Sequence, residues 1–294
     1  MTLQTAKKLL VGFLLITHAV HTRASDSEFR QVVDLTGRTV AIPANPKHVL
    51  SLCTSVTDTM LRLGAVERLA GIDEYSLVVP GATNIAVLGK GSALSREQIL
   101  NRRIDLAFIW WFQDDAAQTL ADLRVPTVKI RCERASEIPA MIHLVGGCVC
   151  ATNQADQLAA KVASQIEALR QAPTTNAPRV FAELYSPFKT AGRNSYLDDL
   201  IGLAGGRNVA SDTDGPILLS AERLLQSDPE VVLLIAGFAS PESFARRNGT
   251  DALAAVKAGR VYSINRYCLV AGAGLPEGVA KLRRLFDNNT QTKP

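Results

Sequence analysis

Two stretches of this chain share one pattern. Residues 95–109 read SREQILNRRIDLAFI and residues 220–234 read SAERLLQSDPEVVLL. Each has Ser-x-Glu-x-aliphatic-Leu, four residues, an acidic residue and then an apolar run. Ser suits a helix N-cap, and Glu in the first turn is favoured by the helix dipole. Each stretch therefore predicts a capped helix that leads into a buried strand. Capping alone can produce such a pattern in any α/β unit, and the alternative is two related lobes of similar topology.

The segments around the two copies alternate between strand and helix patterns. In the first half, apolar runs predict strands over 49–52, 69–72, 106–111 and 125–130, with helices over 54–63, 95–103 and 116–123 between them. Continuous apolar strands that alternate with helices are typical of a parallel sheet covered on both faces. A hairpin is expected before them, over 32–42.

The alternation restarts after one long helical pattern over 153–171. We then expect strands over 180–184, 231–235 and 261–264, and helices over 197–203, 221–226, 251–256 and 276–286. The expected organisation is an N-terminal lobe over 25–152, a connecting helix over 153–172 and a C-terminal lobe over 173–294. Two lobes on a rigid connector define a cleft, which is a favoured place for a ligand.

The first residues predict an export signal. Lys7 and Lys8 precede a short apolar run over 9–16, and small residues follow near Ala24. This order is typical of a cleavable signal peptide over 1–24, and the run is too short to span a bilayer. A buried N-terminal helix is the alternative. No Cys follows closely to carry lipid, so we expect a soluble periplasmic protein.

The export signal also explains the apparent basicity of the chain. The 294 residues include 32 Lys and Arg against 28 Asp and Glu, with a net charge of +4. Three of the basic residues and none of the acidic ones lie in 1–24, which leaves 29 against 28. With only 5% aromatic residues as well, composition gives no support for a nucleic-acid partner.

The cysteines do not define a metal site. Their number is odd, so at least one thiol stays unpaired: Cys53, Cys132, Cys148, Cys150 and Cys268. Cys148 and Cys150 resemble half of a metal site, but no second pair completes it. Small buried thiols are the favoured interpretation, and the pairing is left open.

Enzymatic and cofactor readings find little support. His18 and His21 fall in the predicted signal, which leaves His48 and His143, and no Gly-x-Ser-x-Gly motif is present. Gly89 and Gly91 lack the third glycine of a dinucleotide loop. We therefore expect no catalytic residues, no metal site and no resident cofactor.

Aromatic and cationic residues gather instead at the expected carboxyl ends of strands, where open parallel sheets bind ligands. Such residues suit a bulky, partly apolar ligand that is anionic or chelates a metal. The candidate ligand-binding residues are Tyr75, Trp110, Trp111, Arg131, Tyr185, Tyr196, Arg266 and Tyr267.

Several segments resemble a known family. Residues 34–40 (DLTGRTV) and 42–50 (IPANPKHVL) resemble the opening of the periplasmic binding proteins for cobalamin, ferric siderophores and haem. The most specific match is 196–210, YLDDLIGLAGGRNVA, and GRVY over 259–262 fits the last strand of the family. The resemblance covers about residues 30 to 287. The family's Gly-Pro-Arg before the last helix is replaced here by AGLP over 273–276.

The resemblance implies two Rossmann-like lobes with central parallel sheets, joined by one long helix and with modest hinge motion. It also implies that Glu97 and Glu222 dock onto the transmembrane subunits of an ABC permease. We expect a monomeric, non-enzymatic receptor that delivers a ferric siderophore, cobalamin or haem to an ABC importer. The alternatives are an oxyanion receptor of the molybdate type or a metal-ion receptor of the same fold, and less favoured, an exported two-lobed enzyme.

Overall fold

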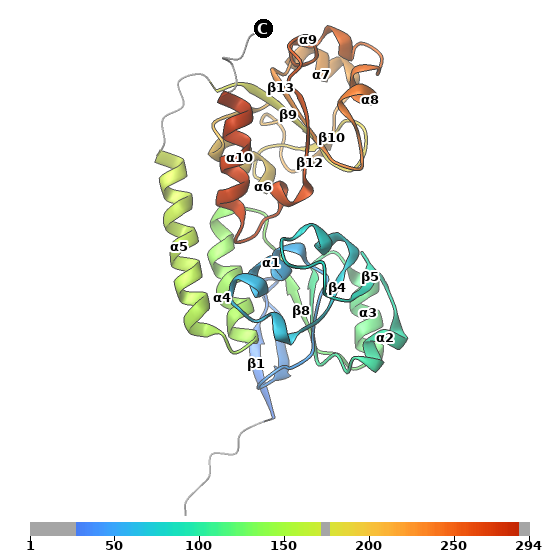
Figure 1. The fold of residues 1–294 in the computed structure, drawn as a ribbon, viewed down its shortest axis with the longest axis vertical. Coiled ribbons are helices and arrows are strands. Elements are labelled where there is room, and N and C mark those ends of the chain that lie inside the picture. The colour runs from blue at the N-terminus through green and yellow to red at the C-terminus, as the bar shows by residue number, and fades with distance from the viewer. Residues whose placement is uncertain (1–27, 172–176, 288–294) are drawn as a thin grey trace, which may run out of the picture.

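The chain folds into two α/β lobes with one long helix alongside them (Figure 1). The computed structural model describes residues 28–171 and 177–287. The expected signal peptide over 1–24 lies outside these residues. Within them, no helix is long and apolar enough to cross a membrane.

The N-terminal lobe is built on a six-stranded sheet with the order β6-β5-β4-β3-β7-β8. All neighbours in it are parallel except β5 and β6. A separate antiparallel hairpin, β1 with β2, precedes the sheet as expected. The elements are β1 (Phe29–Val33), β2 (Thr39–Pro43), β3 (Val49–Ser51), α1 (Thr54–Arg62), β4 (Leu69–Asp73), β5 (Val87–Lys90), β6 (Ala93–Leu94), α2 (Arg96–Asn101), β7 (Leu106–Trp110), α3 (Asp114–Asp122), β8 (Thr127–Ile130) and α4 (Ile138–Cys148).

The C-terminal lobe has a four-stranded parallel sheet with the order β11-β9-β13-β14. The short strands β10 and β12 pair separately and antiparallel. The elements are β9 (Arg179–Glu183), β10 (Lys189–Ala191), α6 (Tyr196–Leu203), β11 (Arg207–Asn208), β12 (Pro216–Leu218), α7 (Ala221–Ser227), β13 (Val231–Ile235), α8 (Pro241–Ala245), α9 (Ala254–Lys257), β14 (Val261–Ile264) and α10 (Leu275–Asp287).

The two sheets repeat one topology. Four neighbouring strands of the N-terminal sheet lie in the spatial order β4-β3-β7-β8, and the C-terminal sheet has the order β11-β9-β13-β14. In both sets, the strand that comes second in the chain lies at one edge, followed by the first, the third and the fourth. The repeated sequence pattern occupies equivalent places, because α2 leads into β7 and α7 leads into β13. Both cap predictions are confirmed: Ser95 Oγ accepts from the Gln98 amide and Ser220 Oγ from the Arg223 amide. Two lobes of similar topology are therefore confirmed.

The long helical pattern is α5 (Thr152–Gln171), which runs beside both lobes (Figure 1). It packs against α4, where a Cβ on Gly146 would lie 2.2 Å from the Cβ of Ala155. Glycine at that position lets the two helices approach closely. The apolar cluster that contains Val49 and Val56 continues through Ala155 and Ile166 of α5 to Val279 of α10. The lobes therefore share a continuous core.

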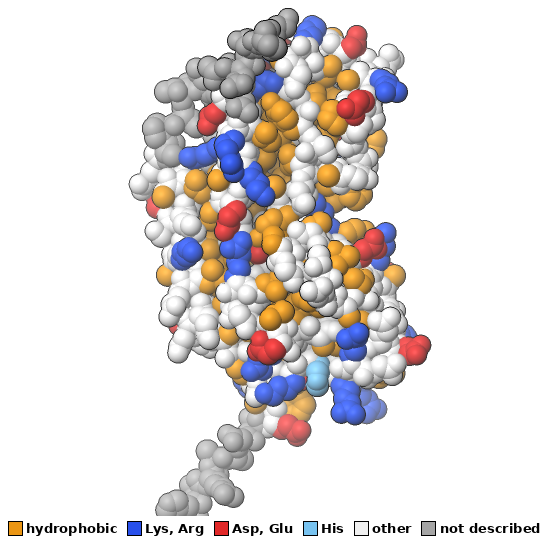
Figure 2. Space-filling model, in the orientation of Figure 1, with side chains coloured by type: hydrophobic (Ala, Val, Ile, Leu, Met, Phe, Trp, Pro, Cys, Tyr) orange, Lys and Arg blue, Asp and Glu red, His pale blue; other side chains and the backbone are white. Residues whose placement is uncertain are grey.

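The outer surface is mixed in charge. On the face drawn in Figure 2, Lys and Arg lie interspersed with Asp and Glu over both lobes, and the molecule narrows between the lobes. This distribution agrees with the near-equal numbers of basic and acidic residues after residue 24.

Two local expectations are wrong. The helix expected over 251–256 is broken into a 3₁₀ turn, Thr250–Ala252, and the short α9, because Leu253 between them is extended. Cys150 is exposed rather than buried, because it lies in the turn between α4 and α5 with φ of 58°. The other four cysteines are buried, and none of the five is paired.

Candidate functional site

A cavity of about 370 Å³ lies between the two lobes. This volume is within the usual range for small-molecule sites. Residues at and beyond the carboxyl ends of strands, together with the first turns of α1 and α6, supply much of its wall. The N-terminal lobe contributes Thr54, Trp110, Trp111, Phe112, Cys132 and Glu133. The C-terminal lobe contributes, among others, Tyr185, Asn194, Ser195, Tyr196, Pro216 and Arg266.

An aromatic group follows the end of β7. The rings of Trp110 and Phe112 are stacked with centroids 6.4 Å apart, and Trp111 meets Phe112 edge-on at 4.9 Å. Phe112 is 61% exposed. A large exposed aromatic beside a cavity presents an apolar face to which a ligand can bind. Trp110 and Trp111 are thus brought together at the cavity, and Phe112 extends their surface.

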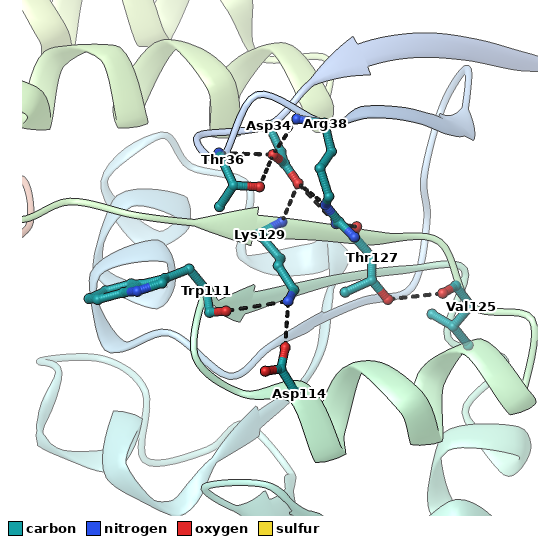
Figure 3. Close-up of polar contacts among 8 residues, drawn as sticks. All are labelled: Asp34, Thr36, Arg38, Trp111, Asp114, Val125, Thr127 and Lys129. Atoms are coloured by element: carbon teal, nitrogen blue, oxygen red, sulfur yellow. Dashed lines mark hydrogen bonds and ion pairs between the residues drawn. The ribbon is translucent and has the colours of Figure 1, made fainter.

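The backbone of this aromatic group is fixed by Lys129 on β8 (Figure 3). Lys129 Nζ donates to the Trp111 carbonyl at 3.3 Å and to Asp114 Oδ1 at 2.7 Å. The Lys129 amide donates to Asp34 Oδ2, which ties β8 to the turn after β1. Burial alone would raise the pKa of Asp34, but hydrogen bonds from Thr36 and Arg38 lower it overall. Asp34 therefore stays ionised and holds this edge of the lobe.

Arg266 is a cationic residue on the wall that the C-terminal lobe supplies, across the cavity from the tryptophans. Its Nε donates to the Tyr185 hydroxyl at 3.1 Å. Its guanidinium also lies 4.4 Å from the ring centroid of Tyr75, which belongs to the other lobe. Tyr185 in turn meets Phe238 edge-on at 5.1 Å. Arg266 thus spans the cleft between two tyrosines, and cation–π contacts of this kind stabilise its position.

Tyr75 and Arg131 lie next to the cavity and are not among its wall residues. The ring of Tyr75 contacts the guanidinium of Arg266 through the cation–π interaction described above. Arg131 lies 5.8 Å from the ring of Trp111 and forms an ion pair with Glu133. Both residues support a wall residue rather than form the wall.

Tyr267 is turned away from the cavity. Its hydroxyl donates to Asp58 Oδ1 at 2.7 Å and accepts from Arg62 at 2.9 Å. Asp58 also accepts from the Gly274 amide at 2.8 Å, and Arg62 pairs with Glu277. Asp58 and Arg62 belong to α1, and their partners belong to the C-terminal lobe. We call this set the α1 latch and assign Tyr267 to it.

A second polar contact joins the lobes on α6. Arg134 and the Ala135 amide both donate to the carboxylate of Asp199. Close by, Tyr196 lines the cavity with its ring while its hydroxyl donates to the Val270 carbonyl at 2.6 Å. Burial raises the pKa of Tyr196 well above its usual value, so its phenol stays protonated and holds the 270 loop.

Some residues of the site carry no sequence signal. Asp58 and Arg62 are spaced i, i+4, which indicates a helical ion pair, but nothing in the sequence shows their partners more than 200 residues later. Gly215 and Pro216 reach the wall from the amino end of β12 rather than from the carboxyl end of a strand.

Glu97 and Glu222 are exposed in the first turns of α2 and α7. Hydrogen bonds from its own backbone and from Ser220 lower the pKa of Glu222. Among the described residues, no three His, Cys, Asp or Glu gather in a group able to hold a metal ion. His143 pairs with Asp156 on the surface, away from the cavity.

Comparison with known proteins agrees with this architecture. A family model described as periplasmic binding protein matches residues 49–267. A Bacillus subtilis protein, named as an uncharacterised ABC transporter substrate-binding lipoprotein, is 22% identical over 85% of this chain and 82% of its own length. A cobalamin-binding protein of Halobacterium salinarum is 23% identical over 87% of this chain and 74% of its own.

The fold is shared with solved structures. The periplasmic heme-binding protein RhuT of Roseiflexus sp. RS-1, in its apo form, superimposes with a TM-score of 0.74 at 22% identity. The match covers 84% of this chain and 100% of that one. Because the family model spans most of both lobes, this chain belongs to the periplasmic binding protein family.

Proposed function

We propose that this protein captures a metal chelate outside the cytoplasmic membrane and delivers it to an ABC importer. The observation that carries the proposal is the cavity between the lobes, with Trp110, Trp111 and Phe112 on one side and Tyr185 with Arg266 on the other. Flat aromatic walls suit a macrocycle or an aryl chelate, and a cation suits a ligand with negative charge.

The ligand class follows from this wall and from the relatives. Their names include a cobalamin-binding and a heme-binding protein, so the candidates are haem, cobalamin and a ferric siderophore. The Tyr185 oxygen at the wall is of the kind that binds ferric iron as phenolate. The metal is cargo in this proposal, and the protein holds no resident cofactor.

The remaining parts of the proposal concern location and partners. The segment 1–24 acts as a cleavable signal that directs the protein to the periplasm. The protein works as a monomer without nucleic acid. Exposed Glu97 and Glu222, one on each lobe, pair with basic residues of two permease subunits, because symmetric lobes suit a two-fold partner.

The proposal is tested by titrating residues 25–294 with haemin, cyanocobalamin and a ferric catecholate, followed by visible absorption and calorimetry. We expect one chelate to bind at a one-to-one ratio, with a Kd between about 1 nM and 1 μM. Recovery of the chelate unchanged by mass spectrometry separates a receptor from an enzyme. Failure of all three to bind at micromolar concentrations would contradict the proposed ligand class.

A further inference from the structure

The N-terminus of α1 has no cap of its own. Cys53 occupies the N-cap position without a side-chain hydrogen bond, and the first turn has no acidic residue. Burial raises the pKa of the Cys53 thiol well above its usual value, so the thiol supplies no negative charge. The first amides of a helix lack intrahelical acceptors and carry partial positive charge. The nine-residue α1 therefore presents uncompensated donors at its start.

Two buried hydroxyls at the same place have no hydrogen-bond partner. Thr54 is 2% exposed and Ser55 is fully buried, and neither side-chain oxygen is bonded. On the same helix, buried Thr57 bonds to Ser51, and Thr59 donates to the Ser55 carbonyl. Buried polar groups in native proteins are nearly always paired. Two neighbouring unpaired hydroxyls at the start of one helix therefore offer donors that an acceptor group placed there would satisfy.

This helix start is at the ligand cavity. Thr54 is a wall residue, together with Cys132 and Tyr196. The loop of the other lobe passes directly over Ser55, since a Cβ on Gly272 would lie 3.4 Å from the Ser55 Cβ. The acidic wall residue Glu133 is paired with Arg131, and Arg266 adds a cation to the wall. Among the described residues, Arg266 is therefore the one cation of the wall without an ion-pair partner among the wall residues, and the buried Asp73 carboxylate lies within electrostatic reach of both Arg266 and Cys53.

We propose that the start of α1 is an oxyanion subsite of the cavity, where wall residue Thr54 and the first backbone amides of the helix donate to a carboxylate or phosphate group of the ligand, with Ser55 buried directly behind them. The inference rests on the proposed function, because the group is carried by the chelate that fills the cavity. It also divides the candidates. Haem has free carboxylates and cobalamin has a phosphodiester, whereas the oxygens of a ferric catecholate are already bound to iron.

The test uses Thr54→Val, which keeps the side-chain shape, Ser55→Ala and the double variant. Removing an unpaired buried hydroxyl costs no hydrogen bond in the empty protein, so its melting temperature stays the same or rises. Affinity moves the opposite way and falls about 10- to 100-fold in the double variant, because a bond to a charged group is lost. Thr190→Val is the matched control, since its buried hydroxyl is also unpaired and it is not a wall residue. Its affinity should not change.

The ligand is varied in parallel. Haemin is compared with its dimethyl ester, and cyanocobalamin with dicyanocobinamide, which lacks the phosphate together with the rest of the nucleotide loop. In the wild type the haemin ester should bind more weakly than haemin by the same factor, and neither ligand without its anionic group should lose further affinity in the double variant. Equal binding of both ligand forms, or of wild type and variant, would overturn the subsite while leaving the proposed function standing.

A third arm uses molybdate, phosphate and citrate alone. If no chelate binds but wild type binds one of these anions and the double variant does not, the subsite stands and the chelate proposal fails. If the wild type binds no chelate and no free anion, both proposals fail.

Discussion

Asp58 is the residue whose replacement tests the α1 latch most directly. Asp58 is 2% exposed, and its carboxylate accepts hydrogen bonds from Arg62, Tyr267 and the Gly274 amide. In Asp58→Asn, one acceptor oxygen becomes an NH₂ donor that faces partners which are themselves donors, so at least one of these bonds is lost. A bond to a charged group contributes about 1.5 to 3 kcal/mol. Arg62 is 30% exposed, so its ion pair adds less than about 1 kcal/mol.

The expected loss is therefore about 2 to 4 kcal/mol of unfolding free energy, and the melting temperature falls by about 4 to 8 °C for a chain of this size. Calorimetry of residues 25–294 without ligand measures the shift. Small-angle scattering should also show a larger radius of gyration, since the bonds join the lobes. Asp122→Asn is the control, because its pair with Arg96 is exposed and its loss should not move the melt. An Asp58→Asn melt that overlays the wild type would refute the latch.

Three further predictions concern titration, ligand contact and docking. Burial raises the pKa of Asp73 to about 6, against about 3.9 when unfolded; the folded state therefore holds this proton more tightly. Unfolding free energy should drop by about 2 to 3 kcal/mol as pH rises from about 4 to 6, and denaturant titrations of Asp73→Asn should lack that drop. Tyr185→Phe should weaken chelate binding about 10-fold through its lost hydroxyl, while Tyr262→Phe, outside the cavity wall, should bind like the wild type. Glu97→Arg with Glu222→Arg should abolish uptake of the chelate in cells and keep the Kd for the chelate unchanged. The control pair is Glu67→Arg with Glu242→Arg, where Glu242 also follows a Ser cap. Uptake by cells that carry the Glu97→Arg, Glu222→Arg variant would contradict the docking assignment.

The strand-end rule located most of the cavity from sequence because parallel strands converge at one edge of each sheet. It brought Trp110 and Trp111 together with Tyr185, Tyr196 and Arg266, all of which are wall residues. The same rule could not predict in which direction each side chain of a turn points. Arg266 and Tyr267 are neighbours in a 3₁₀ turn, and their side chains point to the cavity and to Asp58 respectively. Local patterns do not encode which of two adjacent side chains faces which partner.

Contacts between the two lobes could not be predicted from the sequence at all. Periodicity and capping describe a segment and its near neighbours, and periodicity predicted the helix that contains Asp58 correctly. The partners of Asp58 are Tyr267 and Gly274, which become neighbours only once two separately folded sheets have docked. The α1 latch could thus be found only in three dimensions.

The position of this latch on α1 bears on how the protein handles its ligand. Thr54, at the proposed subsite, and Asp58, in the latch, are four residues apart on one helix, which is about 6 Å along its axis. A ligand group bound at Thr54 and the C-terminal lobe held at Asp58 therefore contact the same rigid element. Opening the lobes widely would break the buried bonds of Asp58 and those between Arg134 and Asp199, and would also separate the halves of the shared core. Capture and release should consequently proceed through small adjustments around α1, with the loop at Gly272 moving against Ser55.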